Sequence, residues 1–403
     1  MKKVLAILLA FAMIFTLAAC GEEKETTGSD VVKVGMVCIG DDNAAYDRNF
    51  YMAADAAKEI LAGKGINIEW TYTYNHPEGD PVAVDCADLA DSGCQVVFLN
   101  SYGQEPAMLT VAADYPDTVF ASLTNEASQR DDLPNTINAF PSIFEARYLA
   151  GVAAGCKLQQ MIDEGEITPE EAVIGYVGAF TFAEVLSGYT SFFLGARSVC
   201  PSTTMLVEFI GSWGDLTMEA NTAQDLIDRG AVLISQHSDS TSPATTAQKN
   251  GVYHVGYNIA MSDVAKDSSI ISSRIDWTKY FVYVIETVVN GGTVDQDYMG
   301  HGLAEGEVCL TDLNEAIAAP GTAEKIAEAE AAIKSGALHV FDTSTFTVGG
   351  VHPTEGLVDM DGDFAGEPDY NAIFDGYYHE SYFKSAPNFD LRIDGITLVN
   401  EAY

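Results

Sequence analysis

A regular alternation of strand-like and helix-like segments, beginning at residue 31, is the feature that most constrains the fold. Residues 31–39 form an apolar, β-branched run typical of a buried strand, and 48–61 form an Ala-rich helical pattern that ends near Gly63. The rest of this first series is predicted as strands over 66–74, 95–99 and 118–123 and helices over 82–91 and 106–114. Such an alternation implies a parallel sheet covered by helices on both faces.

The same alternation returns after a long helix that we predict over 142–162. The second series is predicted as strands over 172–177, 204–210, 232–235 and 252–257 and helices over 182–199 and 217–229. Beyond Val348 the pattern weakens, so 347–403 is expected to be an irregular, acidic extension that wraps the body. The sequence therefore predicts an α/β protein with two doubly wound, parallel-sheet lobes.

Open parallel sheets bind ligands beyond the carboxyl ends of their strands, so we place the site in the loops that follow the strands. These loops are 40–43, 100–103, 124–126, 178–180, 211–213, 236–239 and Asn258. They are rich in polar and aromatic side chains and poor in Lys and Arg. That composition favours a neutral, ring-containing polar ligand over a phosphate.

The overall charge excludes several kinds of partner. The chain has 59 Asp and Glu residues against 20 Lys and Arg, which gives a formal net charge of −39. Nucleic-acid binding depends on Lys and Arg side chains that displace counterions from phosphates. We therefore expect the folded body to bind neither nucleic acid nor an anionic lipid surface.

The N-terminus has the pattern of an export signal. Two lysines precede an apolar run that ends in Leu-Ala-Ala-Cys-Gly at 17–21, which resembles the lipobox of bacterial lipoproteins. In such proteins the thiol of the cysteine, here Cys20, is acylated before cleavage. We therefore expect a signal peptide over 1–19 and a lipidated tether over 20–30 that anchors the protein to the outer face of the cell membrane. The alternative is an ordinary signal peptide with an incidental cysteine.

Motifs for catalysis or cofactor binding are missing from the sequence. Asp41 and Asp42 stand where a phosphate-binding loop would need a Lys, and neither Gly-x-Ser-x-Gly nor His-Glu-x-x-His occurs. The acidic run 359–363 lacks the spacing of a calcium loop. His237 follows a predicted strand, and we interpret it as a structural hydrogen-bonding group. We expect no catalytic residue, no cofactor and no metal, and we interpret the protein as non-enzymatic.

The six cysteines after Cys20 form no Cys-x-x-Cys pair, and their spacing indicates neither a zinc site nor a disulfide framework. Cys86 and Cys94 are close enough in sequence to be bridged. Each lies in an apolar context, which favours buried free thiols.

Several stretches taken together carry a family resemblance. They are the lipobox, 34–36 leading to 40–42, 144–151, 174–180, 211–213 and 272–277. Over roughly residues 34–346 they resemble the basic membrane protein family, which comprises lipoprotein substrate-binding components of ABC transporters, several of which capture purine nucleosides. The resemblance implies a type I periplasmic-binding-protein fold with a hinge and a ligand cleft between the lobes, a monomer, and permease and ATPase subunits as partners.

The resemblance also implies three segments that cross between the lobes, near 138–141, 271–275 and 294–302. The expected domains are an N-terminal lobe of 31–138 with 275–300, a C-terminal lobe of 139–274 with 301–346, and the extension 347–403.

In nucleoside-binding members of this family, aromatic rings sandwich the base and carboxylates hold the ribose hydroxyls. The matching positions here are Asp42, Tyr46, Phe180, Trp213 and Asp239. Arg274 stands near a hinge where the family has a Lys, and could pair with Asp239 or bind the ligand. The remaining candidates are Asn100, Ser101, Tyr102, Glu184, Asn258 and Trp277. For several of these, packing or helix capping is the alternative role.

The function expected from these observations is capture of a small polar ring-containing ligand, foremost a purine nucleoside, by closure of the cleft and its delivery to an ABC permease. A surface lipoprotein that senses the ligand and signals to a membrane partner is the first alternative. A nucleoside or sugar hydrolase is the second.

Overall fold

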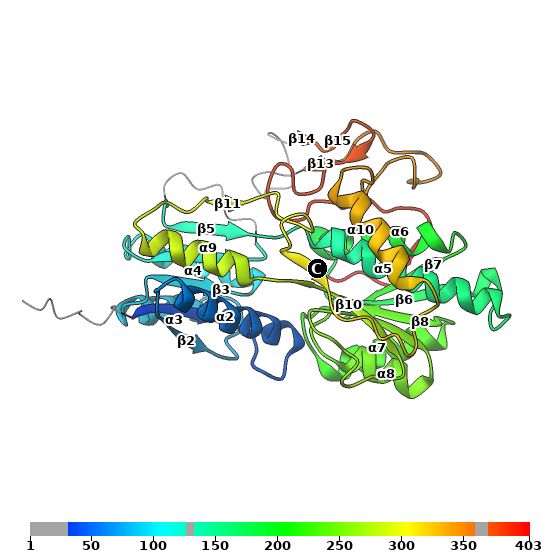
Figure 1. The fold of residues 1–403 in the computed structure, drawn as a ribbon, viewed down its shortest axis with the longest axis horizontal. Helices are drawn as coiled ribbons and strands as arrows, with labels where there is room; N and C mark the ends of the chain where they lie inside the picture. The colour runs from blue at the N-terminus through cyan, green and yellow to red at the C-terminus, as the bar shows by residue number, and fades with distance from the viewer. Residues whose placement is uncertain (1–30, 126–132, 359–369) are drawn as a thin grey trace, which may run out of the picture.

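The computed structural model describes residues 31–125, 133–358 and 370–403. The expected signal peptide over 1–19, Cys20 and the whole tether over 20–30 lie outside these residues, as does the acidic run 359–363. Two parallel sheets stand side by side along the long axis of the molecule, each covered by helices (Figure 1). The predicted α/β class with two doubly wound lobes is thereby confirmed.

The first sheet has six strands, all parallel, in the order β11-β5-β4-β3-β1-β2. Its strands are β1 (Val32–Val37), β2 (Ile68–Thr73), β3 (Val96–Leu99), β4 (Val119–Leu123), β5 (Thr136–Ala139) and β11 (Asp297–Tyr298). The helices between them are α2 (Ala45–Gly63), α3 (Pro81–Asp91), the 3₁₀ turn η1 (Tyr102–Gln104) and α4 (Glu105–Ala112), and α9 (Thr278–Val289) precedes β11.

The second sheet has seven strands in the order β12-β10-β9-β8-β6-β7-β17, and only β12 runs antiparallel to its neighbour. Its strands are β6 (Val173–Gly178), β7 (Thr204–Phe209), β8 (Leu233–Gln236), β9 (Tyr253–Tyr257), β10 (Ser269–Ile275), β12 (Val308–Leu310) and β17 (Ile396–Leu398). The helices of this lobe are α5 (Ile143–Asp163), η2 (Pro169–Glu171), α6 (Ala183–Val199), α7 (Leu216–Asp228), α8 (Ser242–Asn250) and α10 (Thr322–Lys334).

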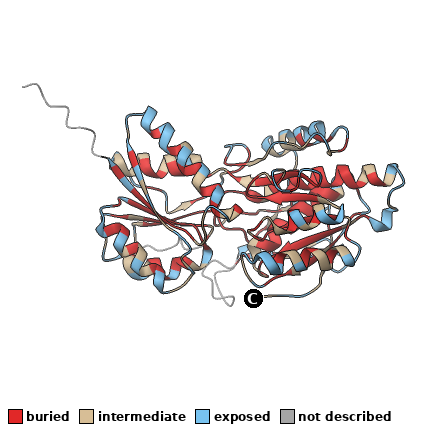
Figure 2. Ribbon diagram, turned by 90° about the horizontal axis from the view of Figure 1, so that it is seen from below, coloured by how far each residue is buried: buried red, intermediate tan, exposed pale blue. Residues whose placement is uncertain are grey.

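The chain passes between the sheets three times, from β5 to α5, from β10 to α9 and from β11 to β12. Because the strands of both sheets are nearly all parallel, their carboxyl ends gather at one edge of each sheet. Figure 2 shows the buried strands at the centre of each lobe and the exposed outer faces of the helices. No helix within the described ranges is long and apolar enough to span a bilayer.

The C-terminal segment differs in part from the irregular structure that its sequence suggested. It contains the short strands β13 (Leu357–Val358), β14 (Tyr370–Asn371), β15 (Ile373–Phe374) and β16 (Tyr377–Tyr378). Further on, β17 adds to the edge of the second sheet beside β7. A three-residue strand gives almost no periodic signal, and its formation depends on an edge strand far away in the sequence.

All six cysteines of the described residues are free, and Cys86 and Cys94 are both buried. The preference for free thiols at these two positions is therefore confirmed.

Candidate ligand-binding site

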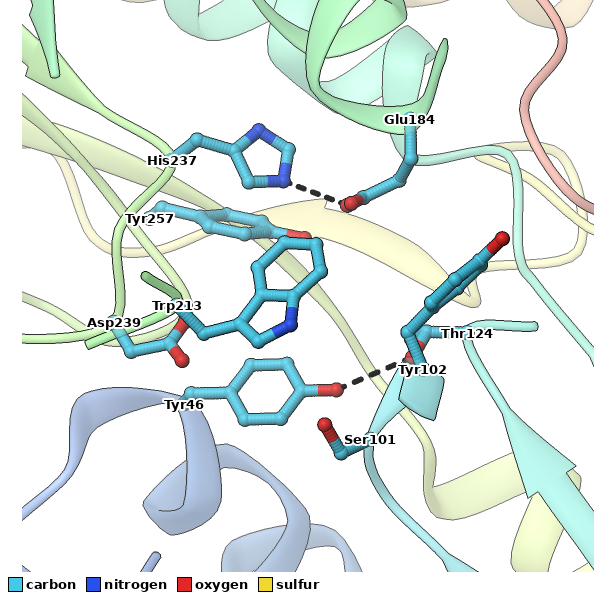
Figure 3. Close-up of a pocket in the computed structure, with 9 residues that line it drawn as sticks. All are labelled: Tyr46, Ser101, Tyr102, Thr124, Glu184, Trp213, His237, Asp239 and Tyr257. Carbon is cyan, nitrogen blue, oxygen red and sulfur yellow. Dashed lines mark hydrogen bonds and ion pairs between the residues drawn. The ribbon is translucent and has the colours of Figure 1, made fainter. Parts of the chain in front are cut away.

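A cavity lies where the carboxyl ends of the two sheets face each other. Its walls carry side chains of both lobes (Figure 3). They are Tyr46, Ser101, Tyr102 and Thr124 from the first lobe and Glu184, Trp213, His237, Asp239 and Tyr257 from the second.

Tyr46 forms much of the first-lobe wall from the start of α2. Its hydroxyl donates to the carbonyl oxygen of Asn100, at the end of β3, and lies 3.4 Å from Thr124 Oγ1, after β4. Thr124 has a left-handed backbone with φ of 64°, which turns the chain sharply as the strand ends. The ring of Tyr46 is thus fixed by the ends of two neighbouring strands.

Behind Tyr46, a buried network sets the position of the first loop. Asp47 accepts hydrogen bonds from the Gly40 amide at 3.1 Å and from Asn100 Nδ2 at 2.8 Å, while Asn100 Oδ1 accepts from the Ile39 amide at 2.9 Å. Burial raises the pKa of Asp47 to about 6, although these hydrogen bonds act to lower it. The Asn100 side chain makes its hydrogen bonds within this network, so it supports the wall instead of lining the cavity.

A cluster of aromatic rings forms the opposite wall. Trp213 lines the cavity, and the Phe180 ring meets it edge-on at 5.1 Å between centroids. Phe180 stacks on Phe182 at 5.1 Å, and Phe182 in turn stacks on Tyr102 of the first lobe at 5.7 Å. These contacts join the loops after β6 and β7 and extend the aromatic surface across the gap between the lobes.

The polar end of the cavity is built around His237. Its Nε2 lies 2.6 Å from Glu184 Oε1, and its Nδ1 lies 3.2 Å from an Arg147 guanidinium nitrogen. Burial lowers the pKa of His237, and since a guanidinium only donates, Nδ1 is the acceptor and Nε2–H donates to Glu184. The Arg147 guanidinium stacks over the ring of Tyr257 at 3.5 Å and donates to the Gln236 carbonyl at 2.9 Å.

Asp239 offers a carboxyl group with no hydrogen-bond partner among the described residues. Burial, together with the negative charge of Asp47, Glu219 and other nearby carboxylates, raises its pKa well above the ordinary value. Its main chain is bound on both sides: the amide donates to the Trp213 carbonyl at 3.0 Å, and the carbonyl accepts from the Ala45 amide of the first lobe at 3.1 Å. The last contact ties the lobes together beside the cavity.

Of the twelve residues that the sequence suggested as ligand contacts, the structure brings six to the cavity. They are Tyr46, Ser101, Tyr102, Glu184, Trp213 and Asp239. Phe180 lies in the layer directly behind Trp213, and Asn100 belongs to the network behind Tyr46.

The other four lie elsewhere. Asp42 is exposed in the turn before α2, and Asn258 is buried at a left-handed position with φ of 70° after β9. Arg274 does not pair with Asp239 as suggested: its guanidinium lies 3.6 Å from Asp276, because alternation along β10 turns it away from the cavity. Trp277 is a core residue, 1% exposed, that stacks on Phe50 at 5.2 Å.

Three lining residues were not among those candidates. Thr124 and His237 lie in loops that the sequence marked, but His237 was interpreted as structural and Thr124 carried no distinguishing signal. Tyr257 ends a strand, so its position after a β-rich run could have identified it. Within 31–125, 133–358 and 370–403, no group of three or more His, Cys, Asp or Glu residues could hold a metal ion.

Two α/β lobes, three crossing segments and a cavity at the carboxyl ends of both sheets define the type I periplasmic-binding-protein fold. Solved structures agree in fold. An ABC transporter solute-binding protein from Aeropyrum pernix K1 matches with a TM-score of 0.61 at 17% identity, covering 80% of this chain and 94% of that one. One from Conexibacter woesei matches with a TM-score of 0.56 at 19% identity, covering 77% and 98%.

The chain belongs to the Bmp family of PnrA-like ABC transporter substrate-binding proteins, whose family model matches residues 32–339. A purine-binding protein of Brucella abortus is 31% identical over 326 residues, which cover 80% of this chain and 85% of that protein. A putative ABC transporter glucose-binding protein of Haloferax volcanii is 30% identical over 266 residues, which cover 66% of this chain and 64% of that protein. The family suggested by the sequence is thereby confirmed.

Membership of this family defines the coarse function. The protein is an ABC transporter substrate-binding protein, a non-enzymatic class that acts outside the cytoplasm together with permease and ATPase components.

Proposed function

We propose that this protein captures a purine nucleoside in the cavity between its lobes and delivers it to an ABC permease. The observation that carries the proposal is the composition of the cavity, where aromatic rings of both lobes face a space that also holds two carboxyl groups. A planar base with an attached sugar needs both kinds of surface.

The aromatic walls suit the base. Tyr46 comes from the first lobe and Trp213 from the second, and Figure 3 shows both rings turned toward the same space. Tyr46 is fixed through its hydroxyl, and Trp213 is braced by Phe180 and Phe182. Rings held in place before binding lose little conformational entropy when a base stacks on them.

The carboxyl groups suit the sugar hydroxyls. Glu184 is held by His237 through Oε1, so its Oε2 remains to accept from a ligand hydroxyl. Asp239 has a raised pKa and an open carboxyl group, which can donate as well as accept. No Lys or Arg lines the cavity, whereas two carboxyl groups do, so the charge of a nucleotide phosphate would find no cationic partner there.

A hexose is the second candidate, favoured by the Haloferax volcanii relative that is described as glucose-binding. A pyranose ring also packs on an aromatic face and bonds to carboxylates. It needs fewer aromatic walls than this cavity provides, which is why we rank it below a nucleoside.

We further propose that Cys20 is the lipidated residue and that its lipid holds the protein at the outer face of the cell membrane, as the sequence 17–21 suggests. Metabolic labelling with palmitate tests this: the wild-type chain should take up label, and Cys20→Ser should take up none. Equal labelling of both would refute the assignment.

Isothermal titration of the purified protein with adenosine, guanosine, adenine, glucose and AMP tests the ligand class. We expect binding of the nucleosides, weaker binding of the free base because it leaves the carboxyl groups unused, and none of AMP. Binding of glucose alone would overturn the proposal in favour of the hexose. Release of free base on prolonged incubation would indicate a hydrolase.

A further inference from the structure

The chain beyond the family match returns to the wall of the cavity. The family model ends at residue 339, whereas β17 runs parallel to β7, with Ile396 opposite Met205 and Leu398 opposite Val207. We call residues 396–403 the tail. Because β7 leads directly into the loop that carries Trp213, the tail lies beside one of the two loops of the aromatic wall.

Asn400 fixes the end of β7. Its side-chain Oδ1 accepts from the Phe209 amide at 2.7 Å, and its Nδ2 donates to the Phe209 carbonyl at 2.8 Å. The amide side chain thus satisfies both backbone groups of the last residue of the strand. Two bonds to one residue restrict rotation as well as translation, so the start of the Trp213 loop has one orientation.

A second pair of bonds fixes the other loop. The Thr181 amide donates to the Ala402 carbonyl at 2.6 Å, and the Ala402 amide donates to Thr181 Oγ1 at 2.8 Å. Thr181 is 6% exposed and stands between Phe180 and Phe182, the two rings that brace Trp213. The tail therefore holds the backbone between these rings.

The two loops are also bonded to each other. The Ile210 amide donates to the Gly178 carbonyl at 3.0 Å, and the Gly211 amide donates to the Ala179 carbonyl at 2.9 Å. The tail lies beside this point, since a Cβ added at Gly211 would be in ordinary van der Waals contact with Ala402 Cβ, at 3.7 Å. Movement of one loop is thus transmitted to the other.

We propose that the tail is a positioning element of the binding site, which acts through Phe209 and Thr181 to hold Phe180, Phe182 and Trp213 as one aromatic wall. It contributes no side chain to the cavity lining. The choice of adenosine as the ligand in the following test rests on the proposed function. The expected effect of the tail on the conformational order of the two loops does not.

The test compares five variants of the full chain. Asn400→Ala removes both bonds to Phe209, and Asn400→Asp keeps only the acceptor. Thr181→Ala removes the hydroxyl that binds the tail, and Thr181→Ser retains it. Tyr403→Ala is the matched control, because this tail side chain is 78% exposed.

Two measurements are made on each variant at a temperature well below its melting point. Hydrogen exchange without ligand should become about tenfold faster over 179–184 and 210–215 in Asn400→Ala and Thr181→Ala, and remain unchanged over 100–104 of the first lobe. The dissociation constant for adenosine should rise about tenfold in the same two variants. Asn400→Asp should have an effect at least as large as Asn400→Ala, because a carboxylate oxygen would face the Phe209 carbonyl oxygen, and Thr181→Ser and Tyr403→Ala should match the wild type.

Wild-type exchange in both loops of Asn400→Ala and Thr181→Ala would overturn the proposal, as would faster exchange with unchanged adenosine affinity. If the wild-type protein binds no adenosine, the proposed function fails. In that case the exchange rates of the two loops, and the affinity for whichever other ligand binds, still decide the role of the tail.

Discussion

Trp213 and Trp277 show how one residue type serves two purposes in this protein. Trp213 follows β7 and is half-buried at the cavity, where two phenylalanines brace one side of its ring. Trp277 precedes α9, is 1% exposed and stacks on Phe50. Both belong to stretches that carry the family resemblance. Both also follow a strand, β7 or β10, so only the tertiary structure separates the residue that lines the cavity from the core residue.

At the residue scale, we predict that Trp213→Ala weakens nucleoside binding. Stacking of a base on an aromatic side chain is worth about 1–3 kcal/mol, which corresponds to a dissociation constant about 5- to 140-fold higher. Titration calorimetry with adenosine measures the change. Trp213→Phe, which retains an aromatic face, should recover part of the loss, and Tyr382→Ala, with a side chain 60% exposed, should show none. Full affinity in Trp213→Ala would contradict the stacking geometry.

At the element scale, the packing of α5 on α6 positions the polar end of the site. A Cβ on Gly151 would lie 2.0 Å from the Phe192 carbonyl oxygen, and one on Gly195 would lie 2.0 Å from the Tyr148 carbonyl oxygen. The two backbones therefore approach more closely than any side chain would allow. The same two helices carry Arg147 and Glu184, so this approach also sets where His237 is held.

We predict that Gly195→Ala lowers the free energy of unfolding by about 1–3 kcal/mol or more, because the methyl group must separate two packed helices. Urea denaturation measures the effect. Gly63→Ala is the matched control, since it stands at the end of α2 with no atom within 4 Å of the added methyl group. It should be neutral or stabilising by up to about 1 kcal/mol. Equal stability of the two variants would refute the close packing.

The elements also show where sequence patterns fail. The helix α8 is rich in Ser and Thr, residues that favour caps and turns over helix interiors, and the sequence did not predict it. Pro243 in its first turn and the left-handed Gly251 at its end define it in the structure. The strand β10 was predicted only as a crossing segment, because its serines gave no apolar alternation.

At the scale of the whole molecule, some of the many carboxyl groups of this acidic chain are buried in the fold. Burial raises the pKa of Glu380 to about 7 and that of Asp47 to about 6. The folded state therefore binds protons at a pH where the unfolded chain does not. Stabilisation from these groups is complete below their unfolded pKa values and is lost as the pH rises through the folded values.

We predict that the melting temperature rises as the pH is lowered from 8 to 6.5, which is the reverse of what ion-paired carboxylates would give. Relief of repulsion in a chain of net charge −39 acts in the same direction. Each raised carboxyl contributes at most about 1.4 kcal/mol per pH unit. Below pH 6.5 the buried His254, whose pKa burial lowers to about 3, opposes the trend.

Differential scanning calorimetry across this pH range measures the trend. Glu380→Gln should reduce the change of melting temperature with pH, because it removes one of the titrating carboxyl groups. The local structure should be retained, since glutamine can still accept the bonds that the Asn388 and Phe389 amides donate to the carboxylate. A melting temperature that rises from pH 6.5 to 8 in the wild type would contradict the prediction.

The sequence alone determined the α/β class, the two series of strands and the family, because each depends on local periodicity and on motifs contiguous in the chain. It also placed the site in the loops after the strands. The tertiary structure decided which loop residues meet: it brought Tyr46 opposite Trp213, turned Arg274 away and bonded Asn400 to Phe209. These contacts depend on strand order, on side-chain alternation and on distances between segments up to 191 residues apart, none of which local patterns encode.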